Sequence, residues 1–150
     1  MTEPLKKYII AIDQGTTSCR SILFDKNGNI IGTEQKEFKQ IFPENGWVEH
    51  DPIEILNTQI KTLKDLINNN QVDVKEIDSI GITNQRETTV LWNKRTGQPV
   101  YNAIVWQDNR TADFCEKLKT KDLTELISTK TGLVIDSYFS STKINWILEN

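Results

Sequence analysis

The fold is decided by a stretch near the N-terminus, Tyr8-Ile-Ile-Ala-Ile-Asp-Gln-Gly-Thr-Thr-Ser-Cys-Arg-Ser-Ile-Leu-Phe-Asp25. Its first part, Tyr8–Ile12, is a continuous apolar run, which is typical of a strand covered on both faces. A polar turn, Asp13–Ser18, follows it. Cys19–Asp25 then reads as a second strand, whose side chains alternate between two faces. The stretch therefore predicts two antiparallel strands joined by a tight turn.

The next elements extend this sheet. Asn27-Gly28 is a strong hairpin signal, so a third antiparallel strand is expected from about Ile30 to Phe38. Pro52 suits the first position of a helix. Apolar residues then recur at helical spacing and predict an amphipathic helix with a core-facing stripe. The stripe consists of Ile53, Leu56, Ile60, Leu63 and Ile67. Because Ile77–Thr83 follows a helical crossover, we expect this strand to be parallel to one of the first strands.

The rest of the chain continues the mixed pattern. Thr88–Trp92 and Val100–Trp106 read as two further strands. Helical patterns dominate from Thr111 to Ser128 and again from Ser141 onward. The fold class expected is α/β, a mixed sheet flanked by helices, which is similar to the actin-like, ribonuclease-H-like ATPase domain.

Composition narrows the class of protein. A length of 150 residues fits one domain, and a net charge of −3 argues against a nucleic-acid-binding surface, which needs a basic stripe. The apolar run Tyr8–Ile12 is far too short to span a membrane. Cys19 and Cys115 form no paired framework, which suits a reduced, cytoplasmic protein. The single histidine, His50, leaves too few ligands for a zinc site, and we interpret it as structural.

The turn Asp13–Ser18 carries the first candidate site. Gly15 lets the backbone approach a ligand closely, and Asp13, at the end of a buried strand, can orient Mg²⁺ through water. Arg20 lies just after the turn and could reach a phosphate, although a position on a solvated strand face is equally consistent with its sequence. Hydroxyl and backbone donors suited to phosphate oxygens come from Thr16, Thr17 and Ser18. Taken alone, the hexapeptide is also compatible with an ordinary polar hairpin turn.

A second set of candidates follows the strand Ile77–Thr83. Arg86 and Glu87 combine donors with an acceptor, which matches the hydroxyls of a neutral polyol, but both reach one ligand only if the chain bends there. The alternative is a surface ion pair. The face of Trp106 can pack on polyol carbons, and the loop residue Tyr138 offers a hydroxyl. Core packing is the alternative for both aromatic residues.

These segments together resemble the glycerol-phosphorylating members of the FGGY carbohydrate kinase family. The similarity extends over essentially the whole chain and is carried by several blocks in the same order. The blocks are Ile12-Asp-Gln-Gly-Thr-Thr-Ser18, Gly46-Trp-Val-Glu-His-Asp-Pro52, Gly81-Ile-Thr-Asn-Gln-Arg-Glu-Thr88, Asn102-Ala-Ile-Val-Trp-Gln107, Thr131-Gly-Leu-Val-Ile135 and Tyr138-Phe-Ser140. The Asn-Gln-Arg-Glu block favours glycerol over a pentose or gluconate.

The resemblance implies specific roles. It implies phosphoryl transfer from ATP to glycerol with Mg²⁺, in a cytoplasmic protein that is homo-oligomeric at full length and binds neither nucleic acid nor membrane. Asp13 would belong to the metal and phosphate site. ATP phosphates would be bound by Thr16, Thr17, Ser18 and Arg20. Glycerol would be bound by Arg86, Glu87, Trp106 and Tyr138.

The resemblance also implies that residues 1–150 are the N-terminal part of the family's first domain. The catalytic base, the adenine pocket and the second domain are expected beyond Asn150, so the chain alone is expected to be inactive. The apolar helix pattern that stops at Asn150 without a cap is in line with a cut inside a longer protein. Three alternatives stay open at this stage. They are another FGGY kinase acting on a pentulose or hexose, an actin-like or chaperone-like nucleotide switch, and a naturally truncated binding module.

Overall fold

The computed structural model describes residues 6–120 and 123–150, and the chain forms two compact units. Unit 1 comprises Met1–Lys39 and Ile53–Gln85. Unit 2 comprises Gln40–Pro52 and Arg86–Asn150. Each unit has its own set of strands and helices, so the two are described separately.

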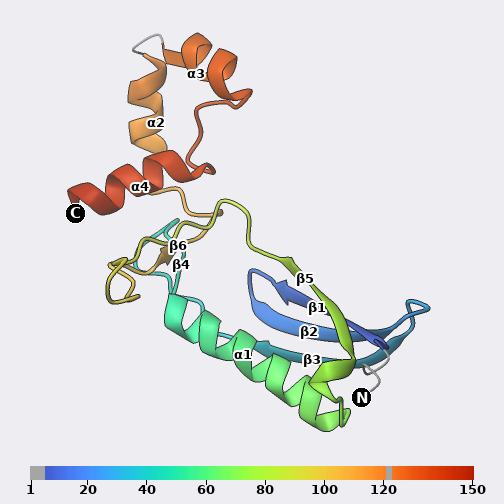
Figure 1. Ribbon diagram of the computed structural model, residues 1–150. Coiled ribbons are helices and arrows are strands. Elements are labelled where there is room, and N and C mark those ends of the chain that lie inside the picture. The colour runs from blue at the N-terminus through green and yellow to red at the C-terminus, as the bar shows by residue number, and fades with distance from the viewer. Residues whose placement is uncertain (1–5, 121–122) are drawn as a thin grey trace. The chain divides into compact units, whose positions relative to one another are not determined.

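A four-stranded mixed sheet is the centre of unit 1 (Figure 1). It contains β1 (Tyr8–Gln14), β2 (Ser18–Asp25), β3 (Ile30–Glu37) and β5 (Ile77–Thr83), in the order β3-β2-β1-β5. The strands β1, β2 and β3 pair antiparallel, and β5 lies parallel to β1. The helix α1 (Pro52–Asn69) and a short 3-10 turn (Val74–Glu76) precede β5. The predicted strands, their directions and the helical crossover are thereby confirmed.

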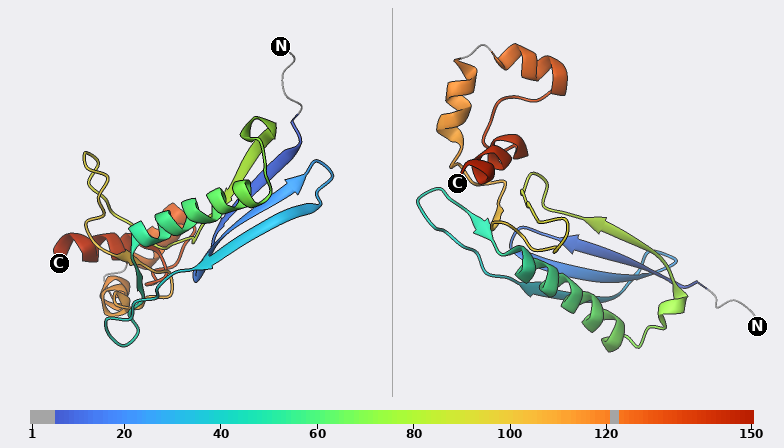
Figure 2. Two further views of the ribbon diagram at one scale, coloured as in Figure 1. Left: turned by 90° about the horizontal axis from the view of Figure 1, so that it is seen from below. Right: turned by 60° about the vertical axis from the view of Figure 1, so that its left-hand side comes forward.

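The helix α1 lies along one face of this sheet, as Figure 2 shows. The buried core consists of Ile10, Leu23 and Leu66, with Leu63 and Ile67 packed against it. The predicted core stripe is wrong for its first half, because Ile53, Leu56 and Ile60 are exposed by 36%, 53% and 41%.

The middle of α1 instead buries two threonines, Thr58 and Thr62. A buried hydroxyl is tolerated when it has a hydrogen-bond partner. The hydroxyls of Thr62 and Ser21, on β2, lie 3.0 Å apart, and the Gln59 amide donates to both. Polar packing between α1 and the sheet therefore replaces the apolar packing that the periodicity indicated.

Unit 2 combines a small ribbon with three helices. The strands β4 (Glu49–His50) and β6 (Ala103–Ile104) pair antiparallel. The helices are α2 (Ala112–Lys119), α3 (Leu123–Thr131) and α4 (Ser140–Glu149). The helical pattern expected from Thr111 to Ser128 is therefore two helices, and residues 121–122 of it lie outside the described residues. The helix expected from Ser141 onward is confirmed as α4.

The two strands predicted at Thr88–Trp92 and Val100–Trp106 are reduced to isolated bridges and β6. Thr89 and Ile104 exchange backbone hydrogen bonds of 2.8 and 3.0 Å, and Trp92 forms a bridge with Pro99. Proline has no N–H to donate to a ladder, which interrupts regular pairing at this position. The two segments do contact each other, but they do not form the two full strands that were predicted.

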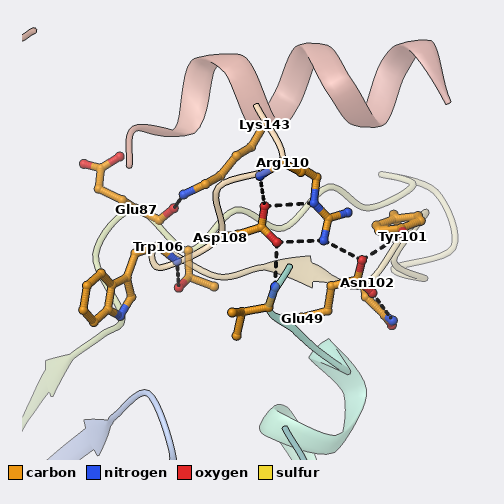
Figure 3. Close-up of polar contacts among 10 residues, drawn as sticks. Glu49, Glu87, Tyr101, Asn102, Trp106, Asp108, Arg110 and Lys143 are labelled. Atoms are coloured by element: carbon orange, nitrogen blue, oxygen red, sulfur yellow. Dashed lines mark hydrogen bonds and ion pairs between the residues drawn. The ribbon is translucent and has the colours of Figure 1, made fainter. Parts of the chain in front are cut away.

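Unit 2 contains a cluster of buried charged side chains, which Figure 3 shows, with two half-buried tryptophans packed against it. The Arg110 guanidinium donates to Glu49 at 2.7 Å and to both carboxylate oxygens of Asp108 at 2.9 Å. Its carbon lies 3.9 Å from the ring centre of Trp47 and 4.6 Å from that of Trp146, on α4. None of the Arg110 side chain is exposed. We name this set of five residues the Arg110 cluster.

In the part of the chain that the structure describes, no helix is both long and apolar enough to cross a lipid bilayer.

Candidate functional site

The turn after β1 is built around a close backbone approach. The N–H of Gly15 donates to the carbonyl of Ser18 at 3.0 Å, which closes the hairpin between β1 and β2. A Cβ atom on residue 15 would lie 3.0 Å from that same carbonyl oxygen, closer than side chains normally come. The turn therefore favours glycine, and its tightness brings the residues on either side of it together.

The register of the sheet gathers the candidate phosphate residues. Asp13 on β1 is paired with Arg20 on β2, and paired residues project from the same face. Ser18, two residues before Arg20, lies on that face as well. Gln35 on β3 joins the last two, because its amide donates to the Ser18 hydroxyl at 3.0 Å and accepts from Arg20 Nε at 2.9 Å.

Gln35 was not predicted as a site residue, since a lone glutamine in a polar strand gives no signal until the register is known. Of the two remaining candidates, Thr16 is half-buried and Thr17 is exposed. The backbone carbonyl of Thr17 accepts from Phe38 N–H at 3.3 Å, which ties the turn to the end of β3. The candidates of the turn thus form one polar surface in unit 1.

The donor set at Asp13 fits a hydrated magnesium ion. Among residues 6–120 and 123–150, no group of three or more His, Cys, Asp or Glu side chains could hold a metal ion by itself. A half-buried carboxylate with no ion pair in the same described ranges suits Mg²⁺, which keeps most of its water and uses one or two carboxylates plus phosphate oxygens. Asp13 is therefore the residue of this surface that would hold the ion.

The second set of candidates lies in unit 2, where the chain bends at Glu87. Glu87 has φ of 64°, a left-handed conformation that residues with a side chain rarely adopt. This is the bend that the sequence analysis required if Arg86 and Glu87 are to meet one ligand. Arg86 is exposed, and Glu87 is half-buried.

The Glu87 carboxylate sits at the N-terminus of α4. Its Oε2 accepts from the backbone N–H of Ser140 at 3.1 Å and from the Ser140 hydroxyl at 2.9 Å. A carboxylate is stabilised there by the unpaired N–H groups and by the helix dipole. Its Oε1 has no hydrogen-bond partner among the described residues, so this oxygen is available to accept from a ligand hydroxyl.

Two aromatic residues complete the set. The rings of Trp106 and Tyr138 meet edge to face, with centres 6.0 Å apart. The backbone N–H of Trp106 donates to the hydroxyl of Thr88, the residue after Glu87, at 3.3 Å. Tyr138 is 37% exposed, so neither pure core packing nor full exposure describes it. Unit 2 therefore brings Glu87, Trp106 and Tyr138 together, which the sequence alone did not establish.

Lys143, on α4, is a residue of this set that the sequence analysis missed. Its side chain is fully buried, and its ammonium donates to the carbonyls of Glu87 at 3.1 Å and Tyr138 at 2.7 Å. Burial lowers the pKa of Lys143 to about 8, although the charges of Asp108, Glu87 and Asp136 oppose the shift. In the sequence it looks like an ordinary lysine of an amphipathic helix, so only the fold reveals it.

A mostly apolar pocket of about 220 Å³ also opens beside Glu87. Its lining includes Leu118, Ile127, Ile135 and Phe139, but none of Arg86, Trp106 and Tyr138. The pocket therefore shares Glu87 with the polar cluster, but its other walls are mostly apolar and do not match a small polyol.

Comparisons with known proteins identify the family of the chain. The model of the FGGY family of carbohydrate kinases, N-terminal domain, matches residues 8–150. Glycerol kinases of Carboxydothermus hydrogenoformans and Xylella fastidiosa are 61% and 59% identical to the chain over 145 residues, which is 97% of this chain. The chain spans 29% of the length of these curated relatives.

Solved structures give the same result at the level of the fold. The structure of Plasmodium falciparum glycerol kinase with ADP superposes with a TM-score of 0.88 at 35% identity, over 99% of this chain and 30% of that one. Gluconate kinase from Lactobacillus acidophilus gives a TM-score of 0.85 at 27% identity, over 96% of this chain and 28% of that one. The expected actin-like α/β fold and the family resemblance are both confirmed, and the chain belongs to the FGGY family of carbohydrate kinases.

Proposed function

We propose that the full-length protein transfers the γ-phosphoryl group of ATP to glycerol and forms glycerol 3-phosphate. This chain would be the N-terminal part of the first domain and would supply part of the phosphate and metal site and part of the glycerol site. The observation that carries the proposal is the cluster of Glu87, Trp106 and Tyr138, in which an available carboxylate oxygen lies with two aromatic side chains. The similarity of 59–61% to glycerol kinases supports the choice of substrate.

The cluster suits a small polyol chemically. The Glu87 Oε1 accepts from one hydroxyl, while the exposed Arg86 guanidinium and the Tyr138 hydroxyl can donate to others. The ring of Trp106 offers an apolar face for the carbon chain. Charge compensation between Arg86 and Glu87 keeps the site close to neutral, which fits an uncharged substrate.

The Asp13–Ser18 surface suits the phosphates of ATP. Backbone and hydroxyl donors of Thr16, Thr17 and Ser18, together with the Arg20 guanidinium, would bind phosphate oxygens. Asp13 would orient Mg²⁺ through bound water. When bound, the ion neutralises charge that develops on the phosphates during transfer.

Phosphoryl transfer also needs a group that takes the proton of the attacking hydroxyl. Asp13 would be committed to the metal, and Glu87 is already bound to Ser140 and is suited to hold a hydroxyl. We therefore propose that the base comes from the part of the full-length protein outside these 150 residues. The same part would supply the adenine pocket, the second domain and the contacts of a homo-oligomer in the cytoplasm.

The alternatives make different predictions. Another FGGY kinase would prefer a pentulose or a hexose, and a nucleotide switch would bind ATP without phosphorylating any small molecule. The sequence identity to the gluconate kinase of known structure is 27%, well below the 61% identity to the glycerol kinase of Carboxydothermus hydrogenoformans. This difference favours glycerol as the substrate. The Glu87 cluster would have no ligand to bind in a pure switch.

A substrate panel tests the proposal. The full-length protein is assayed with ATP and Mg²⁺ on glycerol, gluconate, a pentulose and a hexose, with ADP release and phosphorylated product both measured. Glycerol should give the highest kcat/KM by at least about 100-fold, since a site built for its hydroxyls leaves polar groups unpaired with a wrong substrate. A higher kcat/KM for any of the other three would reject the assignment of glycerol, and ATP binding without any product would favour the switch.

A further inference from the structure

The most unusual side chain of unit 2 is a buried lysine with two backbone ligands. Lys143 is 0% exposed, although lysine is almost never fully buried unless it is paired. No carboxylate of the described residues lies within 4.0 Å of its ammonium. Its hydrogen-bond partners are the carbonyls of Glu87 and Tyr138, so the charge is not part of a close ion pair.

The two carbonyls belong to segments that are far apart in the sequence. Glu87 follows β5, and Tyr138 lies in the loop before α4, so 51 residues separate the two carbonyls that Lys143 joins. An ammonium has three donors on a flexible stem and can bind both at once. Lys143 is therefore a cross-link between the backbones of two proposed glycerol-binding residues.

The backbone of Glu87 needs such support. Its φ of 64° is unfavourable for a residue with a side chain, and conformations of this kind persist only when the surroundings hold them. Two contacts hold this conformation, one at the side-chain carboxylate and one at the backbone carbonyl. Ser140 binds the carboxylate at 2.9 and 3.1 Å, and Lys143 binds the carbonyl at 3.1 Å.

We propose that Lys143 is a positioning residue of the glycerol site, which fixes the backbones of Glu87 and Tyr138 so that both side chains meet the same substrate. The inference rests on the proposed function, because it takes glycerol as the ligand of these two residues. Lys143 itself touches no substrate. A buried ammonium is costly, and burial of an apolar side chain of similar length would serve stability alone equally well. The need for a two-carbonyl donor explains why a lysine occupies the position.

The test compares Lys143→Met with wild type in the full-length protein. Methionine has a similar length but no donor, so the helix keeps its packing while both hydrogen bonds are lost. We expect KM for glycerol to rise at least about tenfold, as for the loss of a charged hydrogen bond, and KM for ATP to stay within about twofold. Lys143→Gln keeps one donor group and should give an intermediate KM, and it replaces the methionine variant if that protein does not fold.

A neighbouring residue provides the matched control. Thr142, also on α4 and 5% exposed, shares a buried hydrogen bond of 2.9 Å with Thr111 and bonds neither Glu87 nor Tyr138. Thr142→Val therefore loosens the attachment of α4 without touching the cross-link. Loss of folded protein lowers the apparent kcat but leaves KM unchanged, so a merely structural role for Lys143 would not move KM for glycerol.

The outcomes separate the two proposals. A wild-type protein that phosphorylates glycerol, together with an unchanged KM in Lys143→Met and Lys143→Gln, overturns the positioning role and leaves the proposed function intact. An equal rise of KM in Thr142→Val also overturns it, since general loosening of α4 would then suffice. A wild-type protein inactive on glycerol rejects the proposed function, and the inference that rests on it is rejected with it.

Discussion

Replacing Arg110 with methionine should loosen α4 selectively. The Arg110 side chain is fully buried and forms ion pairs with two carboxylates, Glu49 and Asp108, which are themselves at most 2% exposed (Figure 3). Removing one partner of a buried ion pair costs about 3–5 kcal/mol, because the remaining charge loses its compensation. Both carboxylates keep neutral donors, from Tyr101 and Asn102 for Glu49 and from the Val48 N–H for Asp108, so the lower end of this range applies.

The same substitution removes the stacking of the guanidinium on Trp146, whose ring centre is 4.6 Å away. A buried contact of this kind adds up to about 2 kcal/mol. Since Trp146 is a residue of α4, the loss should appear as easier local opening of this helix. The loss of about 3 kcal/mol from the ion pairs alone corresponds to roughly 100-fold faster amide exchange when exchange reports the open population, and the lost stacking adds to it.

Hydrogen–deuterium exchange of the full-length protein, analysed for peptides of Ser140–Glu149, measures this effect. Peptides from α1 serve as the internal control, because their core of Ile10, Leu23 and Leu66 belongs to unit 1 and contains no residue of the Arg110 cluster. Adding Glu49→Gln to Arg110→Met should recover part of the loss, since one uncompensated charge disappears. Unchanged exchange in α4, or equal acceleration in α1, would refute the reasoning.

Four further results are expected. Asp13→Asn should lower kcat by about 100-fold or more, a loss of roughly 3 kcal/mol of electrostatic stabilisation. The affinity for glycerol, measured by calorimetry, should stay unchanged. Near-normal turnover at saturating Mg²⁺ would exclude the metal role of Asp13. Arg86→Ala should raise KM for glycerol by about 10- to 100-fold and leave that for ATP nearly unchanged; an equal loss for ATP would move Arg86 to the phosphate site. Calorimetric melting should show wild type gaining stability relative to Lys143→Met between pH 8 and 9, because the folded pKa of Lys143, about 8, lies below its ordinary 10.5 and the unfolded chain binds more protons in that window. Parallel curves for the two proteins from pH 8 to 9 would contradict the assignment. Met1–Asn150 alone, purified from a host without glycerol kinase, should form no glycerol 3-phosphate; turnover that Asp13→Asn abolishes would place the base within these residues.

The sheet of unit 1 could be predicted because its signals are local. The Asn27-Gly28 turn pairs the two strands that flank it, and the apolar run Tyr8–Ile12 marks a buried strand. Short connections leave each strand little choice of pairing partner. The buried face of α1 could not be predicted in the same way. Burial of Thr62 depends on its hydrogen bond to Ser21, which is 41 residues away, and periodicity of apolar residues contains no information about such a partner.

The candidate residues of the site were recognisable by type and by resemblance, but the contacts that hold them were not. Glu87 was singled out as an acceptor, and the need for a bend was deduced from strand geometry. The bend itself depends on Ser140 and Lys143, more than 50 residues further on. Arg110 likewise resembles any surface arginine in the sequence, because its burial arises only when Trp47 and Trp146 enclose it.

The two sets of candidates are held by different physical means, and this has a consequence for how the protein tolerates change. The Asp13 surface is fixed by strand register and by one glycine, so most single substitutions there remove a side chain without moving its neighbours. The cluster of Glu87, Trp106 and Tyr138 is held by buried charges. Lys143 binds the Glu87 carbonyl directly, and the Arg110 cluster packs on α4, the helix that carries Lys143. Removing a buried charge leaves unpaired groups that the surroundings must accommodate. Substitutions at residues that touch no substrate should therefore impair the proposed glycerol site far more often than the proposed phosphate site. A scan of buried positions in both units, with KM measured for glycerol and for ATP, would test this.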